Sequence, residues 1–268
     1  MNAIDQKFRQ LQNAGKTALI PYLTIGDPDI DTSLDIIAAL EAAGADMIEL
    51  GVPYSDPLAD GPVIQRAAER ALRNRLTIVD CIKVAKKARE AGSRLPFILF
   101  SYYNPILQLG LEKFFALLQE NGISGVIIPD LPVEENEPVK VLAEMSDICL
   151  IPLVAPTSAD RIAKIVAQAS GFVYCVSSLG VTGERSSFYS GLDDFIRTVK
   201  NATALPVAIG FGISRREHVE HFSALCDGVI VGSAIVRKIE EVQPLLLSRE
   251  NRAEGLRQIE AFVRELGG

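Results

Sequence analysis

Short apolar runs recur along the whole chain, and each is followed by a turn and then by a segment with apolar residues at helical spacing. The runs predict eight strands, at Ala18–Thr24, Asp46–Gly51, Pro96–Ser101, Gly125–Ile128, Ile148–Val154, Gly171–Ser177, Pro206–Gly210 and Gly228–Val231. The segments between them predict helices at Thr32–Ala43, Ile78–Ala91, Leu111–Asn121, Glu135–Glu144, Ser158–Ala169, Leu192–Asn201, Arg215–Phe222 and Ser233–Glu240, with a last helix at Ala253–Leu266.

Near-continuous apolar strands that alternate with helices are typical of a parallel sheet covered by helices on its outer face. Eight such units without a polar linker favour an α/β fold with a single (β/α)8 TIM barrel over residues 1–268, as one catalytic domain. We expect extra helices at the N-terminus, after strand 2 and at the C-terminus. The alternative is a doubly wound open sheet, but the first turn, Ile25-Gly26-Asp27-Pro28, lacks the dinucleotide pattern G-x-G-x-x-G, so a nucleotide cofactor is not expected.

The two longest strand-to-strand intervals follow the second and the sixth strand. Active sites of such barrels are built from the loops that follow the strands, so we expect substrate contacts there. The second of these loops, Leu179–Ser190, holds Gly180 and Gly183 and several serines, which predicts a lid that closes over a bound substrate.

Glu49 is a charged residue inside an apolar strand. Alternation along the strand sends Ile48, Leu50 and Val52 to the helix-covered face and Glu49 into the barrel. A buried ion pair would be the structural explanation, but none of the eight predicted strands contains Lys or Arg. An unpaired inward carboxyl near the catalytic rim therefore favours a functional role.

The loop after this strand carries two more carboxylates, Asp56 and Asp60. Both stand in turn-forming sequences, Ser-Asp-Pro and Asp-Gly-Pro, so turn chemistry alone explains either of them. Composition does not choose between the two. A second carboxylate folded over Glu49 would give the usual arrangement of an acid and a base on one substrate.

Glycine-rich turns follow the last three predicted strands, around Gly180–Gly183, Gly210–Gly212 and Gly232–Ser233. Glycine lets backbone N–H groups approach an anion, and Gly232-Ser233 opens a helix with a partial positive charge at its N-terminus. Three adjacent turns in the region where barrels commonly hold phosphate predict a phosphate site.

Composition excludes several other functions. With 27 Lys and Arg against 34 Asp and Glu, the net charge of −7 disfavours binding to nucleic acid or an anionic membrane. No signal peptide or spanning segment is predicted, so a cytoplasmic protein is the default expectation. The cysteines Cys81, Cys149, Cys175 and Cys226 are far apart in sequence and are expected to be buried thiols.

Two aldolase chemistries are also disfavoured. A Schiff base needs a strand lysine, which is missing, and a metal site would need histidines at strand ends. His218 and His221 lie instead on the seventh predicted helix, where surface roles are expected.

Five segments together resemble the alpha subunit of tryptophan synthase over nearly the whole chain. They are Pro21–Pro28, Glu49–Pro62, Pro129–Pro132, Gly180–Gly183 and Gly210–Ile213, and the second, with both carboxylates, is the most specific. The resemblance implies retro-aldol cleavage of indole-3-glycerol phosphate to indole and glyceraldehyde 3-phosphate, as a carbon–carbon lyase of tryptophan biosynthesis without metal or organic cofactor.

The resemblance also implies the site residues. The catalytic pair would be Glu49, as general acid and base, and Asp60, which holds the indole N–H. The remaining substrate contacts would be Tyr22, Phe100, Tyr102, Ile127 and Tyr174 around indole and Thr182, Gly183, Phe211, Gly212, Ile213, Gly232 and Ser233 toward phosphate. Tyr22 and Phe100 stand where the family often has Phe and Leu, and both remain large and apolar.

Members of this family usually act with a pyridoxal-phosphate beta subunit in an α2β2 tetramer and pass indole to it. Asp56, the 102–104 segment and Asp130–Pro132 match loops that face that partner. Two alternatives stay open: a stand-alone lyase that releases free indole, and a non-catalytic barrel that binds a phosphorylated metabolite.

Overall fold

The computed structural model describes residues 1–177 and 191–267. Its strands are β1 (Ala18–Thr24), β2 (Ile48–Gly51), β3 (Phe97–Phe100), β4 (Gly125–Ile127), β5 (Cys149–Leu150), β6 (Leu153–Val154), β7 (Val173–Val176), β8 (Val207–Gly210) and β9 (Gly228–Val231). Its helices are α1 (Ala3–Asn13), α2 (Ile30–Ala42), α3 (Pro62–Leu72), α4 (Ile78–Glu90), α5 (Tyr103–Leu109), α6 (Leu111–Glu120), α7 (Glu137–Met145), α8 (Ile162–Val166), α9 (Leu192–Ala202), α10 (Arg216–Ser223), α11 (Ser233–Leu246) and α12 (Arg252–Gly267), with a 3-10 helix at Pro156–Arg161.

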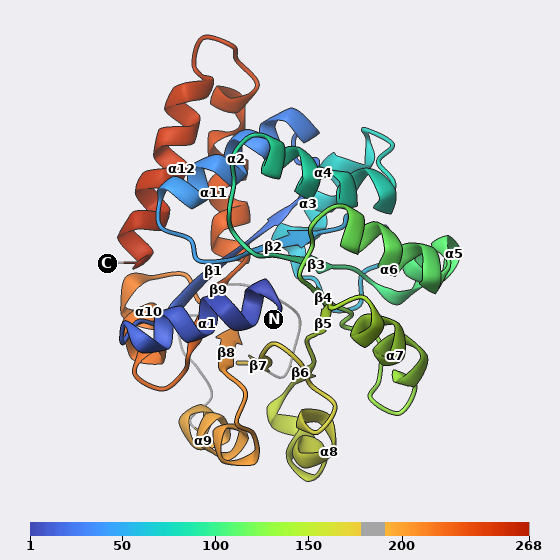
Figure 1. Ribbon diagram of the computed structural model, residues 1–268. Helices are drawn as coiled ribbons and strands as arrows, with labels where there is room; N and C mark the ends of the chain where they lie inside the picture. The colour runs from blue at the N-terminus through green and yellow to red at the C-terminus, as the bar shows by residue number, and fades with distance from the viewer. Residues whose placement is uncertain (178–190, 268) are drawn as a thin grey trace.

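All strand pairs in the sheet are parallel, and the sheet order is β5-β4-β3-β2-β1-β9-β8-β7-β6. The two outermost strands, β5 and β6, are parts of one chain segment. Between them the Ile151 N–H donates to Val126 at 3.0 Å on one side, while the Pro152 carbonyl accepts from Tyr174 at 3.1 Å on the other. The sheet thereby closes into a barrel with the helices around it (Figure 1).

The prediction of a barrel is confirmed, and the fifth strand is the main correction to its details. The single strand expected at Ile148–Val154 is interrupted between β5 and β6. Pro152 explains the interruption, because proline has no N–H to donate to a ladder. The helix expected at Ser158–Ala169 is likewise divided, into the 3-10 turn and α8.

The core has two layers separated by the sheet. Alternate residues of β1 illustrate it: Leu19 and Leu23 pack outward against helices, whereas Ile20 and Tyr22 belong to the inner cluster. Burying large aliphatic side chains on both faces contributes on the order of 2 kcal/mol per side chain, which makes this double layer the main source of stability.

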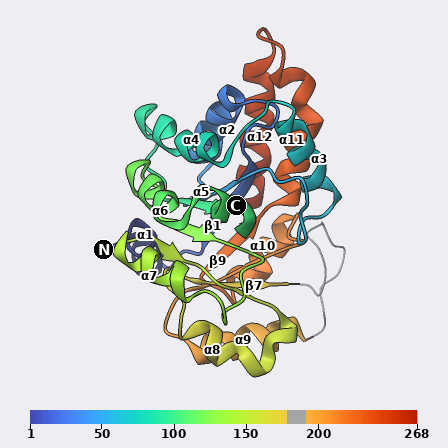
Figure 2. The ribbon, with the colours of Figure 1, turned by 90° about the vertical axis from the view of Figure 1, so that its right-hand side faces the viewer.

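Helix α1 covers the end of the barrel at which the strands begin (Figures 1 and 2). Its apolar side chains Ile4, Phe8 and Leu11 join the inner cluster, and Phe8 packs against Phe172 with 5.4 Å between ring centroids. The Asn2 amide donates to the carbonyls of Ser124 and Asp147, just before β4 and β5. Within the described residues this end is therefore closed, so a ligand site is expected at the end at which the strands finish.

Candidate active site

Glu49 points into the barrel from β2, as its alternation predicts. Its register partners are Tyr22 on β1 and Ile98 on β3, and the residue is 2% exposed. Its Oε1 is buried without a hydrogen-bond partner among the described residues. Burial raises the pKa of Glu49 to about 8, so the carboxyl holds its proton at neutral pH.

Two buried tyrosines narrow the barrel interior beside Glu49. Each lies over a glycine of the next strand: a Cβ on Gly51 would stand 2.1 Å from the Tyr22 hydroxyl, and one on Gly210 would stand 2.2 Å from the Tyr174 hydroxyl. These glycines are needed for space at strand positions where φ is ordinary. Both rings line the same cavity.

Asp60 lies at the end of the long loop after β2, immediately before Gly61 and α3. The residue is 6% exposed, and burial raises its pKa to about 6 although a hydrogen bond from the Tyr102 hydroxyl opposes the rise. The Asp60 carbonyl accepts from the Gln65 amide at 2.7 Å, which ties the loop to the first turn of α3. This carboxyl is ionised at neutral pH while that of Glu49 is not.

A small cavity of about 30 Å³ brings these groups together at the open end of the barrel. Nine of the residues expected from the sequence line it: Tyr22, Glu49, Asp60, Phe100, Tyr174, Phe211, Gly212, Gly232 and Ser233. A pocket with apolar walls and few polar groups is what orients a small ligand with a flat ring.

The glycine-rich end of the cavity is formed by the loop after β8 and by the start of α11. Phe211 has a φ of +72°, an unusual conformation for a residue with a side chain, and the Ser177 hydroxyl donates to its carbonyl. Gly232 and Ser233 begin α11, whose first turn contains no acidic residue. The helix N-terminus is therefore free to attract an anion.

Three of the expected contacts do not line this cavity. Tyr102 is buried beside Asp60, Ile127 belongs to the inner core cluster, and Ile213 packs in the outer cluster. Thr182 and Gly183 lie outside the described residues, as does the predicted lid at Leu179–Ser190.

Sequence reasoning missed two wall residues, Ile64 on α3 and Ile230 on β9. Ile230 could have been found from the inward alternation of its strand, which also places it in the inner cluster. Ile64 gives no such signal, because only the fold of the preceding loop turns α3 toward the barrel.

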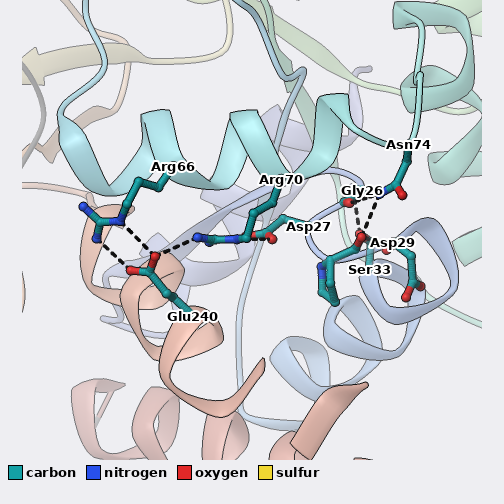
Figure 3. A network of polar contacts seen from close by, with 9 residues as sticks. Gly26, Asp27, Asp29, Ser33, Arg66, Arg70, Asn74 and Glu240 are labelled. Atoms are coloured by element: carbon teal, nitrogen blue, oxygen red, sulfur yellow. Dashed lines mark hydrogen bonds and ion pairs between the residues drawn. The ribbon is translucent and has the colours of Figure 1, made fainter. Parts of the chain in front are cut away.

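Close to this site a second group of carboxylates is fully paired (Figure 3). Arg70 on α3 forms a bidentate pair with the buried Asp27, with both distances 2.8 Å, and reaches Glu240 on α11 at 2.7 Å. Arg66 binds the same Glu240 at 2.9 and 2.7 Å. The network joins the loop after β1 to the helix that follows Asp60 and to the helix that begins at Gly232.

Other chemistry-bearing side chains are remote from the cavity. Over residues 1–177 and 191–267, no His, Cys, Asp and Glu side chains gather in a group able to hold a metal ion. His218 and His221 lie on α10, where His221 contacts Asp193 at 3.1 Å. The four cysteines are buried and unbridged.

Comparison with known proteins identifies the family of this barrel. The family model described as tryptophan synthase alpha chain matches residues 8–267. The chain belongs to the tryptophan synthase alpha chain family. The tryptophan synthase alpha chain of Bacillus pumilus is 53% identical over 250 residues, which cover 93% of this chain and 94% of that protein. That of Bacillus subtilis strain 168 is 51% identical over 249 residues, or 93% of each.

Solved structures agree with this membership. Tryptophan synthase subunit alpha from Legionella pneumophila superposes with a TM-score of 0.90 at 34% identity, covering 99% of this chain and 97% of that one. A tryptophan synthase structure from Mycobacterium tuberculosis gives 0.87 at 35% identity, covering 99% and 97%. The tryptophan synthase alpha family resemblance drawn from the sequence motifs is thus confirmed.

Proposed function

We propose that the cavity between Glu49 and Asp60 is the active site at which this chain cleaves indole-3-glycerol phosphate into indole and glyceraldehyde 3-phosphate. Membership of the tryptophan synthase alpha chain family gives the reaction class, a carbon–carbon lyase of tryptophan biosynthesis. The observation that carries the assignment is the buried Oε1 of Glu49, which has no hydrogen-bond partner among the described residues and lies at the cavity that Asp60 also lines.

Glu49 supplies both proton transfers of the cleavage. Because its pKa is raised to about 8, it begins protonated and gives its proton to the ring carbon that bears the glycerol chain. The resulting carboxylate then takes the proton of the neighbouring hydroxyl. As that O–H becomes a carbonyl, the electrons of the broken C–C bond return to the ring. Indole and the aldehyde leave, and Glu49 is protonated again.

Asp60 stabilises the ring while it is cationic. Protonation of the ring carbon places positive charge on the indole nitrogen, and an ionised carboxylate at its N–H lowers the energy of that intermediate. The pKa of about 6 keeps Asp60 charged at neutral pH. The two carboxyls therefore perform different tasks because burial affects them to different extents.

The glycine-rich end would hold the phosphate. Backbone N–H groups of Gly212, Gly232 and Ser233 and the N-terminus of α11 supply an anion site without a cationic side chain. By the family resemblance Thr182 and Gly183 would also contact the substrate, and the rings of Tyr22, Phe100 and Tyr174 would enclose indole.

We further propose that residues 1–268 act as one catalytic domain in the cytoplasm and pair with a beta subunit in an α2β2 complex. No helix within the described ranges is long and apolar enough to cross a membrane. The exposed Leu58 and the nearby Asp56 lie on the loop that carries Asp60, so a partner bound there would act directly on the catalytic loop.

The test is indole release from indole-3-glycerol phosphate, measured with and without an added tryptophan synthase beta subunit. We expect slow release by the isolated chain and a clear acceleration by the partner, because contact at the Asp56 loop would order Asp60. A full rate that ignores the partner would favour the stand-alone lyase. An absence of cleavage in both conditions would contradict the proposed reaction.

A further inference from the structure

Tyr102 holds the catalytic loop through two successive residues. Its hydroxyl accepts the N–H of Ala59 at 2.9 Å and donates to the carboxyl of Asp60. A phenol can do both at once, because it has one donor and two acceptor sites. The Tyr102 hydroxyl therefore forms hydrogen bonds with the catalytic loop, and the side chain does not line the cavity.

The ring of Tyr102 is itself fixed from two sides. Tyr54, on the loop that leads to Asp60, stacks on it at 5.1 Å between centroids and 29° between planes. The backbone is fixed as well. Tyr102 is the N-cap of α5, and the N–H of Tyr103, the first residue of that helix, donates to Asp130 at 2.9 Å. Asp130, from the loop after β4, thereby caps α5 in place of a local side chain.

No described cation faces Asp60. The titratable groups directed at it or at its cavity are Tyr102 at the N-cap of α5, Tyr22 on β1, Glu49 on β2 and Tyr174 on β7. Burial disfavours the charge of Asp60, and among these neighbours only the Tyr102 hydroxyl donates a hydrogen bond to it.

We propose that Tyr102 is a positioning residue for Asp60, whose hydroxyl keeps the carboxylate oriented toward the cavity and in its charged form. This proposal rests on the proposed role of Asp60. It assigns the phenolic oxygen of Tyr102 a function that does not require the ring to contact indole. Asp130 supports this positioning, because its carboxylate accepts a hydrogen bond from the backbone N–H of Tyr103, the residue after Tyr102.

The test is the pH dependence of kcat/KM for Tyr102→Phe, which removes only the oxygen. Asp60 must be ionised, so activity falls as pH drops through its pKa, and loss of the donor moves that limb to higher pH by about one unit. Dividing the kcat/KM of the variant by that of the parent at each pH removes the pH dependence that Glu49 causes, because both proteins share it. We expect this ratio to be about sevenfold lower at pH 5.5 than at pH 8.

Tyr54→Phe is the matched control. It removes a hydroxyl from the other member of the same stacked pair, one that accepts from Asn104 at 3.4 Å and has no bond to Asp60. The ratio of the kcat/KM of Tyr54→Phe to that of the parent should not vary with pH. A flat ratio for Tyr102→Phe as well would overturn the proposal.

Two further measurements keep the outcomes distinct. If Asp60→Asn retains activity, the proposed function of Asp60 fails; if Asp60→Asn is inactive and the Tyr102→Phe ratio is flat, only the role of Tyr102 fails. Should Tyr102→Phe not fold, Asp130→Ala, which frees the backbone beside Tyr102, must shift the acidic limb in the same direction by a smaller amount. An unshifted limb in that variant would equally overturn the inference.

Discussion

Two pairs of carboxylates in this barrel lie in opposite electrostatic environments. Asp27 and Glu240 are matched by the guanidinium groups of Arg70 and Arg66, and these bonds lower the pKa of Glu240 to about 2. Glu49 and Asp60 face a cavity without a described cation, and burial raises the pKa of both.

The difference separates structural charge from catalytic charge. A paired carboxylate has its interactions complete in the folded state, so it joins elements but cannot give or take a proton near neutral pH. An unpaired buried carboxyl destabilises the fold, yet its pKa reaches the range in which proton transfer is efficient. The residue types are the same, and burial raises the pKa of Asp27 as well, although its bonds to Arg70 oppose the rise. Glu49 and Asp60 have no such arginine among the described residues.

The largest effect is expected from Glu49→Gln. The amide preserves the shape but transfers no proton, so turnover should fall by about 10³-fold while a phosphate-bearing analogue still binds. Steady-state indole release and calorimetric binding measure the two quantities. Turnover within tenfold of the parent would place the general acid elsewhere.

Arg70→Ala tests the paired region. It leaves the buried Asp27 without its partner, and we expect a loss of about 3 kcal/mol in the free energy of unfolding. Arg66→Ala is the control, because its half-exposed pair with Glu240 is screened by solvent and should contribute much less. Urea denaturation measures both. Equal losses would mean that burial does not distinguish the two arginines.

Asp60→Asn should reduce kcat by about 10²-fold, because the neutral amide no longer stabilises the cationic ring. Its unfolding free energy should stay close to that of the parent. A kcat reduction below threefold, determined from initial rates at saturating substrate, is the result that would remove Asp60 from the mechanism.

The raised pKa of Glu49 also makes stability depend on pH. Its folded pKa of about 8 exceeds the ordinary 4.5, so the folded state retains a proton that the unfolded state releases, and stability falls as pH rises toward 8. Relative to Glu49→Gln, the parent should lose about 2 to 3 kcal/mol between pH 6 and pH 9. Denaturation at both pH values checks this, and identical pH profiles would contradict burial of an uncompensated carboxyl.

The smallest effects are expected from His218→Ala and His221→Ala. Both residues lie on α10, away from the cavity, so indole release should change by less than about twofold. Loss of activity in either variant would show that the acid and base are misassigned.

The sequence predicts most of the barrel because apolar alternation depends on local geometry alone. The bounds of β1 and β9 agree with expectation to the residue, and Glu49 points inward as the alternation requires. The apolar pattern predicts no helix at residues 103–109, where α5 forms. Pro105 is tolerated because it stands in the first helical turn, where no intrahelical N–H bond is lost.

The site was less predictable wherever it depends on loops. That Asp60 rather than Asp56 is buried follows from the path of residues 52–61, which no periodicity specifies. The bond between Tyr102 and Asp60 joins loops more than forty positions apart in sequence. Such contacts are consequences of the closed barrel and have no local signature.

The closure of the barrel by α1 has a consequence for the order in which the parts of the chain fold. This helix is synthesised long before its partners Asp147 and Phe172. Until then Ile4, Phe8 and Leu11 form an exposed apolar stripe on a nascent chain. We therefore expect α1 to reach its final place only after residues 147–172 have been made, although it precedes every strand of the barrel.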